Sequence, residues 1–288
     1  FPGRLSAMLK MSTARVSSPS PVDRPQVIAA EGPRKMRVAM LSGCAQQVVG
    51  GNINEATVRL LRRHGVEVVI SRGAGCCGAL TQHMGDEDAA RASARANITA
   101  WLRDRDEDGL DAIVINASGC GTTVKDYGHL LQRDPDWADK AAEVSAMALD
   151  ISELMVRLDL QKTALPPEAA SLKVAYHAAC SLQHGQKVVA PPRTLLQEAG
   201  FNLAEVGEAH LCCGSAGTYN LLQPDIAGQL GQRKAANIQA TGADIVAAGN
   251  VGCMVQIAEH SGLPVVHTVE LLDWATGGPR PTGIINLP

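Results

Sequence analysis

The chain has 288 residues, of which 45% are hydrophobic and 3% aromatic, and its formal net charge at pH 7 is −3. The sequence has no basic stripe interleaved with aromatic residues, which argues against nucleic-acid binding. It also has no apolar run of the roughly 18 residues that a membrane-spanning helix needs. The length suggests about two domains, and their cores must consist of Val, Ile, Leu and Ala because aromatic residues are scarce.

Residues 1–34 are rich in Ser, Pro and Arg, and this composition predicts disorder. Because the sequence begins with Phe1 rather than Met, we interpret this segment as a linker from a missing upstream domain, with a transit peptide as the weaker alternative. From residue 35 onward, short β-branched runs alternate with amphipathic segments. We expect strands at 36–41, 66–70, 112–116 and 148–150, and helices at 52–64, 86–104 and 124–132.

The same order returns after a connector at 151–171, which contains two adjacent prolines. We expect strands at 173–177, 202–206, 244–248 and 265–268, and helices at 191–199, 224–240 and 254–261. Strands that alternate with helices predict the α/β class with parallel sheets. We therefore predict two tandem duplicated cysteine-rich domains, each a small, mostly parallel sheet flanked by helices. Their bounds are 35–150 and 172–276, and a tail follows at 277–288.

The cysteines form two sets with the same spacing pattern: a single cysteine, an adjacent pair and a further single cysteine. The sets are Cys44, Cys76, Cys77 and Cys120, and Cys180, Cys212, Cys213 and Cys253. In both sets, 32 positions separate the first cysteine from the pair. Each cysteine follows a predicted strand, and loops beyond the carboxyl ends of parallel strands meet at one edge of the sheet. We therefore expect two separate sites of four thiols each.

Four gathered thiols have several possible uses. Disulfides are disfavoured because adjacent cysteines pair only with strain and the chain is not a small, loop-rich scaffold. Inert buried cysteines would leave the repeated spacing unexplained. Structural zinc is the strongest alternative, although zinc sites favour paired CxxC motifs on small modules. Thiolate ligation from glycine-rich loops favours an iron–sulfur cluster.

Two further motifs bear on this interpretation. Residues 73–78 fit the GxGxxG dinucleotide pattern, but the corresponding turn of the second half lacks the first two glycines, so we reject a dinucleotide site. His177 and His210 precede cysteines of the second set, where the first half has Met40 and Ala74. We interpret both histidines as hydrogen-bonding or surface residues rather than ligands. The more polar second site should then have the higher reduction potential.

These sequences resemble the cysteine-rich CCG domain, which occurs in tandem in heterodisulfide reductases and in lactate-utilisation proteins. Within this family the chain is most similar to the iron–sulfur subunits of glycolate oxidase (glycolate dehydrogenase). The similar segments are 41–47, 73–79, 116–121, 125–131, 180–187, 210–219 and 250–253.

The chain departs from the family at two points. Ala117 and Asn250 occupy positions where the family pattern has a fifth cysteine, so four thiolates per set favour a 4Fe–4S cluster over a five-ligand noncubane cluster. Glycolate oxidase subunits also carry an upstream ferredoxin-like domain. We find no such segment here and expect that the sequence is truncated before Phe1.

The resemblance implies an oxidoreductase subunit that transfers electrons but is not catalytic alone. All eight cysteines would be metal ligands for up to two 4Fe–4S clusters. Partner subunits with FAD or FMN would oxidise glycolate to glyoxylate, and a quinone or other carrier would accept the electrons. The alternatives are lactate or glycerol 3-phosphate oxidation, heterodisulfide reduction, and a zinc-stabilised assembly module. The resemblance implies a cytoplasmic location, and peripheral contact with the inner face of the cell membrane stays open.

Overall fold

The computed structural model describes residues 20–161 and 163–287. Residues 1–19 of the predicted linker, residue 162 of the connector and residue 288 of the tail lie outside the described residues. The chain divides into two compact units, which meet in the sequence between Asp159 and Leu160. In the part of the chain that the structure describes, no helix is both long and apolar enough to cross a membrane.

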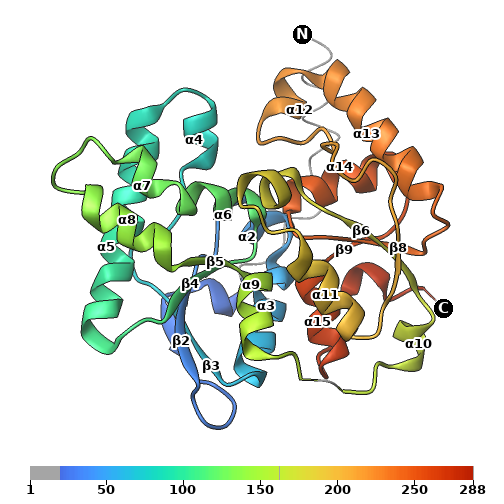
Figure 1. Cartoon of the computed structure of the whole chain (residues 1–288), viewed down its shortest axis with the longest axis horizontal. Coiled ribbons are helices and arrows are strands. Elements are labelled where there is room, and N and C mark those ends of the chain that lie inside the picture. Colours follow the sequence, from blue (N-terminus) through green and yellow to red (C-terminus); the bar gives the residue numbers. More distant parts are fainter. Residues whose placement is uncertain (1–19, 162, 288) are drawn as a thin grey trace. The chain divides into compact units, whose positions relative to one another are not determined.

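The first unit is built on a five-stranded sheet with the order β1–β3–β2–β4–β5 (Figure 1). Its strands are β1 (Gln26–Ile28), β2 (Met36–Met40), β3 (Val66–Ile70), β4 (Ala112–Ile115) and β5 (Ala148–Asp150). Strand β1 runs antiparallel to β3, and all other neighbours are parallel. The carboxyl ends of β2, β3, β4 and β5 therefore lie at one edge of the sheet.

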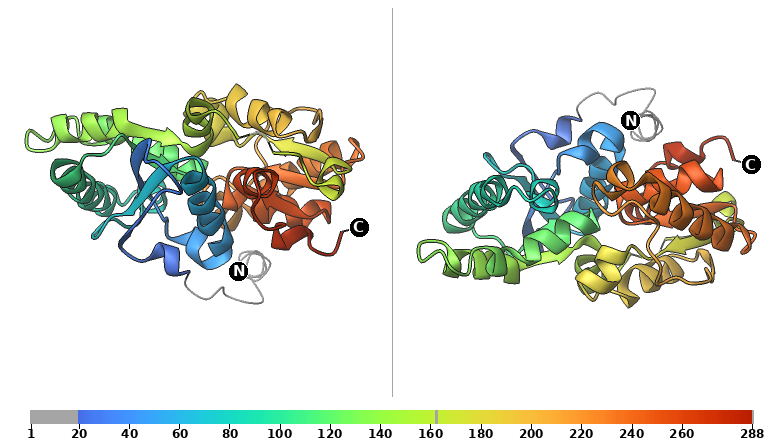
Figure 2. Two further views of the ribbon diagram at one scale, coloured as in Figure 1. Left: turned by 90° about the horizontal axis from the view of Figure 1, so that it is seen from below. Right: turned by 90° about the horizontal axis from the view of Figure 1, so that it is seen from above.

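Helices cover both faces of this sheet (Figure 2). They are α2 (Ala45–Val49), α3 (Gly51–Arg63), α4 (Ala79–His83), α5 (Glu87–Asp108), α6 (Ser118–Lys125), α7 (Tyr127–Leu130), α8 (Ala138–Met147) and α9 (Ile151–Leu158), with a short 3₁₀ turn at Pro21–Asp23. Helix α5 begins where the side chain of Asp86 accepts a hydrogen bond from the Ala89 N–H, as an N-cap residue does. Its buried Ile98 and Trp101 pack with Ile113 of β4 in the core.

The second unit contains a four-stranded sheet with the order β7–β6–β8–β9, in which all neighbours are parallel. Its strands are β6 (Lys173–His177), β7 (Asn202–Ala204), β8 (Ile245–Ala248) and β9 (Val265–His267). Its helices are α10 (Pro167–Ala170), a π-helical turn at Ser181–Gly185, α11 (Ala190–Glu198), α12 (Tyr219–Leu222), α13 (Pro224–Gln239), α14 (Val251–Ser261), α15 (Thr268–Ala275) and a 3₁₀ turn at Thr282–Ile284. The predicted fold class, α/β with mostly parallel sheets, is confirmed.

Two segments differ from the sequence-based expectation. The expected disorder does not extend to residue 34, because β1 pairs with the outer side of β3 and so protects an edge strand. The expected connector begins with a regular helix, α9, since Asp150 and Glu153 form a capping box at its first turn. The proposed domain bounds themselves stay predictions.

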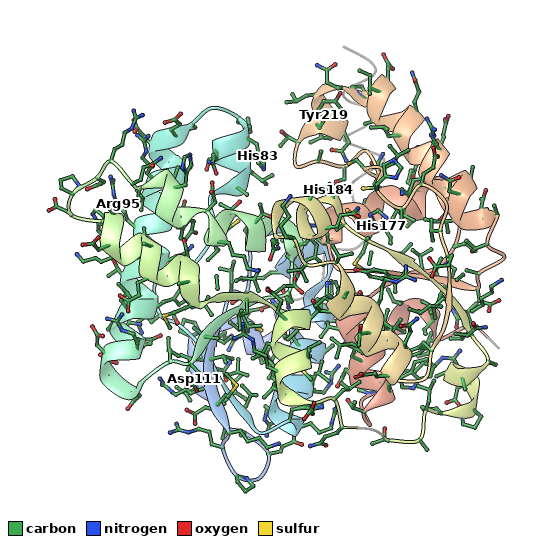
Figure 3. All side chains as sticks on the ribbon, viewed as in Figure 1. His83, Arg95, Asp111, His177, His184 and Tyr219 are labelled. Carbon is green, nitrogen blue, oxygen red and sulfur yellow. The ribbon has the colours of Figure 1, made fainter. Side chains whose placement is uncertain are left out.

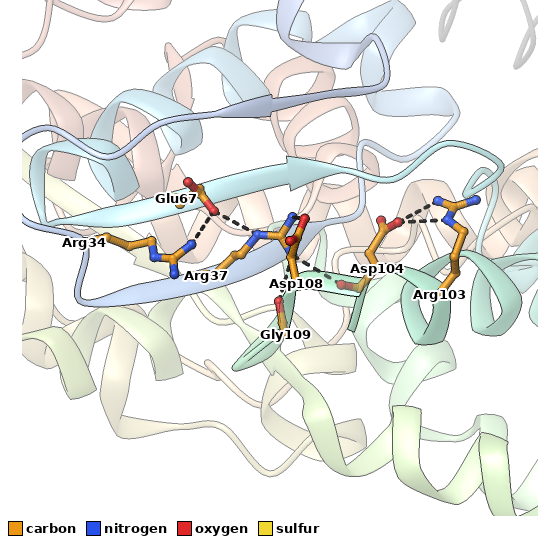
Figure 4. A network of polar contacts seen from close by, with 7 residues as sticks. All are labelled: Arg34, Arg37, Glu67, Arg103, Asp104, Asp108 and Gly109. Carbon is orange, nitrogen blue, oxygen red and sulfur yellow. Dashed lines mark hydrogen bonds and ion pairs between the residues drawn. The ribbon is translucent and has the colours of Figure 1, made fainter. Parts of the chain in front are cut away.

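A polar network closes the amino-terminal edge of the first sheet (Figure 4). The largely buried guanidinium of Arg37 donates to Glu67 at 2.8 Å and to the Gly109 carbonyl at 2.7 Å. The Arg37 N–H also donates to the carboxylate of Asp111 at 2.7 Å. In the second unit, the Lys173 N–H donates to Asp244 at 2.8 Å in the same way. The two units therefore share details at the edge opposite the cysteines.

Candidate metal centres

The first set of cysteines gathers at the carboxyl edge of the first sheet. Cys44 immediately precedes α2, the adjacent pair follows β3, and Cys120 lies in the first turn of α6. The Sγ atoms of Cys44 and Cys76 are 3.5 Å apart. Cys77 follows Cys76 directly in the chain, and Cys120 is near enough to raise the pKa of the Cys77 thiol. The structure therefore brings all four predicted thiols of the first set together.

The second set repeats this arrangement in the second unit. Cys180 follows β6, the adjacent pair follows β7, and Cys253 lies in the first turn of α14. The Sγ atoms of Cys180 and Cys212 are 3.8 Å apart. Cys213 follows Cys212 directly in the chain, and its sulfur lies within 4.8 Å of that of Cys253. All eight cysteines are free thiols.

A glycine after each adjacent pair turns the chain so that two thiols face one site. Gly78 has φ of 86°, and its N–H donates to the Sγ of Cys76 at 3.4 Å. Gly214 has φ of 95°, and its N–H donates to the Sγ of Cys212 at 3.3 Å. A Cβ atom on Gly214 would lie 2.4 Å from the carbonyl oxygen of Ala227. The Cys-Cys-Gly sequence is therefore a backbone requirement as well as a donor set.

Two buried side chains that the sequence did not indicate fix the first cysteine pair. Asn97 of α5 accepts from the Gly75 N–H at 2.7 Å and donates to the Cys76 carbonyl at 3.0 Å. Asn97 also donates to the hydroxyl of Tyr127, which in turn donates to the Cys77 carbonyl at 2.9 Å. These bonds hold the backbone of the pair, so the position of its thiols is fixed before any metal binds.

The second unit has a lysine where the first has Asn97. Gly78 packs against Ala90, Gly214 packs against Ala227, and the residues seven positions after these alanines are Asn97 and Lys234. The side chain of Lys234 is 1% exposed, and its Nζ donates to the Glu208 carbonyl at 2.9 Å. Burial lowers the pKa of Lys234, while the nearby thiols of the second set act in the opposite direction.

The histidines of the second set have different surroundings. His177 ends β6, is 2% exposed, and lies in the second unit as labelled in Figure 3. One of its ring nitrogens and the Sγ atoms of Cys213 and Cys253 all lie within 4.8 Å of one another. His210 is exposed, and its carbonyl oxygen is 3.1 Å from the Nε2 of His184. His177 therefore belongs to the thiol group geometrically.

Crowding makes it difficult for all four thiols of a set to lose their protons together without a cation. The pKa of Cys76 is raised first by the neighbouring Cys77 thiol, and that of Cys77 by the Cys120 thiol. In the second set the pKa of Cys213 is raised, whereas Cys213 lowers that of Cys253 to about 6. A bound metal removes this conflict because it takes thiolates as ligands and displaces their protons. The donor set therefore fits a metal centre.

The fold and the two thiol groups define the class of the protein. It is a tandem α/β protein that carries a four-thiol site at the carboxyl edge of each sheet. The profile of the cysteine-rich domain (CCG) family matches residues 38–125 and 174–258. The chain belongs to this cysteine-rich domain family, and the resemblance inferred from the sequence is confirmed.

Curated relatives carry the same name that the sequence suggested. The glycolate oxidase iron–sulfur subunit of Escherichia coli is 41% identical over 241 residues, covering 84% of this chain and 58% of that protein. The probable glycolate oxidase iron–sulfur subunit of Bacillus subtilis is 34% identical over 262 residues, covering 88% and 58%. Lactate utilization protein A of Shouchella clausii is 25% identical over 244 residues, covering 83% and 99%. The chain thus spans just over half the length of the two glycolate oxidase subunits.

A solved structure of a hypothetical protein from Helicobacter pylori has a similar fold. Its TM-score is 0.57 at 10% sequence identity, and the match covers 98% of this chain and 58% of that one. At this identity the similarity concerns the fold alone.

Proposed function

We propose that this chain is the tandem cysteine-rich part of an iron–sulfur electron-transfer subunit in a glycolate-oxidising complex. The observation that carries the proposal is the gathering of four thiols at each sheet edge in a chain that is 41% identical to the E. coli glycolate oxidase iron–sulfur subunit. The proposed ligands are the eight cysteines. The proposed cofactors are up to two 4Fe–4S clusters.

Thiol spacing in the first unit favours a cluster over a single zinc ion. Tetrahedral zinc with Zn–S bonds of about 2.3 Å holds its sulfurs about 3.8 Å apart. Among the described residues, the one group with three donor atoms mutually within 4.8 Å contains His177 and two cysteines of the second set. The first set is therefore more widely spread than one ion requires, which supports a centre with several metal ions.

The residues around each set prepare it for such a centre. An iron–sulfur cluster, when bound, supplies one-electron transfer at a potential set by hydrogen bonds and solvent exposure. The Gly78 and Gly214 N–H groups donate to ligand sulfurs, and Asn97 holds the loop of the first pair. These groups keep the thiols in place and stabilise negative charge on sulfur.

By this proposal the chain conducts electrons and does not oxidise substrate. Partner subunits with FAD or FMN would take electrons from glycolate, and a quinone or other carrier would accept them. The proposed location is the cytoplasm, with contact at the inner face of the membrane left open. A second candidate substrate is lactate, because the match to lactate utilization protein A extends over 99% of that protein.

Metal analysis of anaerobically purified protein tests the cofactor. We expect about eight iron and eight sulfide ions per chain and visible absorption that dithionite bleaches. Zinc without sulfide would support the assembly-module alternative instead. Substrate is tested by adding flavin subunits: the chain alone should not reduce an artificial dye with glycolate, whereas the reconstituted complex should. Turnover by the chain alone would contradict an electron-transfer role.

A further inference from the structure

The surroundings of His177 are unusual for a histidine that only packs in a protein core. It lies at the carboxyl end of β6, where its side chain is almost completely buried in the second unit (Figure 3). Its Nε2 atom has no hydrogen-bond partner. A buried polar atom without a partner loses its hydration without compensation, and such atoms are uncommon in native proteins. An interaction beyond the protein's own hydrogen bonds would compensate for this loss.

The atoms that face His177 are soft metal donors. One ring nitrogen and the sulfurs of Cys213 and Cys253 lie within 4.8 Å of one another, and all three residues are buried. No other trio of donor atoms among residues 20–161 and 163–287 is as close. Imidazole and thiolate bind the same borderline-soft metals, iron included. The trio is therefore spaced and composed as ligands of one metal centre.

The first unit provides an internal comparison. In the alignment that pairs Cys44 with Cys180, the residue that corresponds to His177 is Leu41 rather than Met40. Leu41 is buried, and its aliphatic side chain offers no metal-binding atom. The two centres thus share four thiols each, and the second has a nitrogen donor in addition.

We propose that His177 binds an iron ion of the second centre directly, while Cys213 and Cys253 bind neighbouring iron ions of the same centre. The assignment rests on the proposed iron–sulfur function and goes beyond the cysteine ligands. The second centre is then a mixed nitrogen–sulfur site and the first a sulfur site. Because imidazole is neutral and thiolate is anionic, a nitrogen ligand favours the reduced state of a cluster.

Nitrogen hyperfine spectroscopy of the reduced, loaded protein tests this assignment. With ¹⁵N-histidine, pulsed electron paramagnetic resonance should detect a strong ¹⁵N coupling on one of the two clusters. His177→Leu, which installs the corresponding residue of the first unit, should abolish that coupling and leave the other cluster unchanged. His184→Leu is the matched control, since His184 lies in the same unit with an exposed side chain, and it should retain the coupling.

The outcomes separate this inference from the proposed function. A protein with two clusters but without strong nitrogen coupling overturns the His177 assignment alone. A protein without iron and sulfide overturns the proposed function, and the assignment with it. The labelled wild-type protein decides the question even where the buried variant fails to fold. His177→Cys gives a second readout: a thiolate in place of imidazole should lower the midpoint potential of the second centre only.

Discussion

The backbone groups of Arg37 in β2 and Lys173 in β6 each form two hydrogen bonds with an aspartate that precedes the neighbouring strand. The N–H to carboxylate distances are 2.7 Å for Asp111 and 2.8 Å for Asp244, and both return bonds are 2.8 Å. The opposite edges of the same sheets are less alike. There the first unit has neutral Asn97 near its cysteines, and the second has buried Lys234.

This comparison separates two kinds of constraint. Features that the backbone requires, such as the paired aspartates and the glycine after each cysteine pair, are the same in both units. The side chains that set charge and polarity around the thiols differ between the two units. Such side chains can change because their replacement does not alter the course of the main chain.

Loss of one ligand should empty one centre and spare the other. In Cys213→Ser the hydroxyl is a poor ligand for iron in a sulfide cluster, so iron content should fall by about half. Flavin reduction by glycolate in the reconstituted complex should persist, while onward electron transfer should be lost. Cys77→Ser is the matched variant in the first unit. If either substitution removes all of the iron, the two sites are not independent.

Glycine replacement should destabilise the second unit more than the first. A Cβ on Gly214 would lie 2.4 Å from the Ala227 carbonyl oxygen, whereas on Gly78 it would lie 3.0 Å from that of Ala90. We expect Gly214→Ala to cost about 3 kcal/mol of unfolding free energy, because backbone strain adds to a steric clash. Gly78→Ala should cost about 1–2 kcal/mol.

Urea unfolding followed by tryptophan fluorescence measures both glycine variants. Trp274 lies in the second unit, and Trp101 and Trp137 lie in the first, so tryptophan-to-phenylalanine backgrounds report each unit separately. If both glycine variants lose the same unfolding free energy, the closer approach of α13 to the glycine turn of the second unit has no energetic consequence.

Lys234 should raise the potential of the second centre. A buried positive charge favours the reduced cluster, so Lys234→Met should lower that midpoint potential by on the order of 60 mV, equal to about 1.4 kcal/mol for one electron. Lys173→Met is the control, because Lys173 lies at the far edge of the same sheet and its Nζ donates to the Thr241 carbonyl. Two indistinguishable midpoints in the wild-type protein would contradict the predicted inequality of the sites.

The smallest expected effect concerns the pH dependence of the first unit. Burial raises the pKa of Asp150, the N-cap of α9, from 3.8 to about 6. Because the folded pKa exceeds the unfolded one, this group's contribution to stability is complete below about pH 4 and is lost as pH rises through about 6. Asp150→Asn keeps a capping oxygen and should remove this slope, on the order of 1 kcal/mol.

Unfolding of the Asp150 variant between pH 4 and 8 measures that slope. The control is the second unit, where the corresponding N-cap of α15 is His267 and the capping box is completed by Glu270. The unfolding free energy of the second unit should be the same in the variant and the wild type at each pH. If the unfolding free energy of the first unit in Asp150→Asn still depends on pH as in the wild type, titratable groups other than Asp150 cause that dependence.

Much of the scaffold was predictable because it follows local patterns. Alternation of β-branched runs with amphipathic segments indicated the α/β class, and cysteines placed just after strands indicated that the thiols would meet at one sheet edge. Short-range composition was misleading in two places. Residues near Val27 resemble a linker until they pair with the edge of β3, and α9 was hidden by the prolines that follow it.

The duplication, the parallel sheets and the two groups of four thiols could be predicted from local sequence, because cysteine spacing and the topology of parallel units dictate them. Which other side chains face the thiols depends on how the helices pack in three dimensions. Asn97 and Lys234 face them because the contacts of Ala90 and Ala227 with the glycine turns set the rotation of α5 and α13. His177 meets Cys213 and Cys253 because β6 lies between β7 and β8 in the sheet. Such packing depends on contacts between residues far apart in the chain, which no local pattern records.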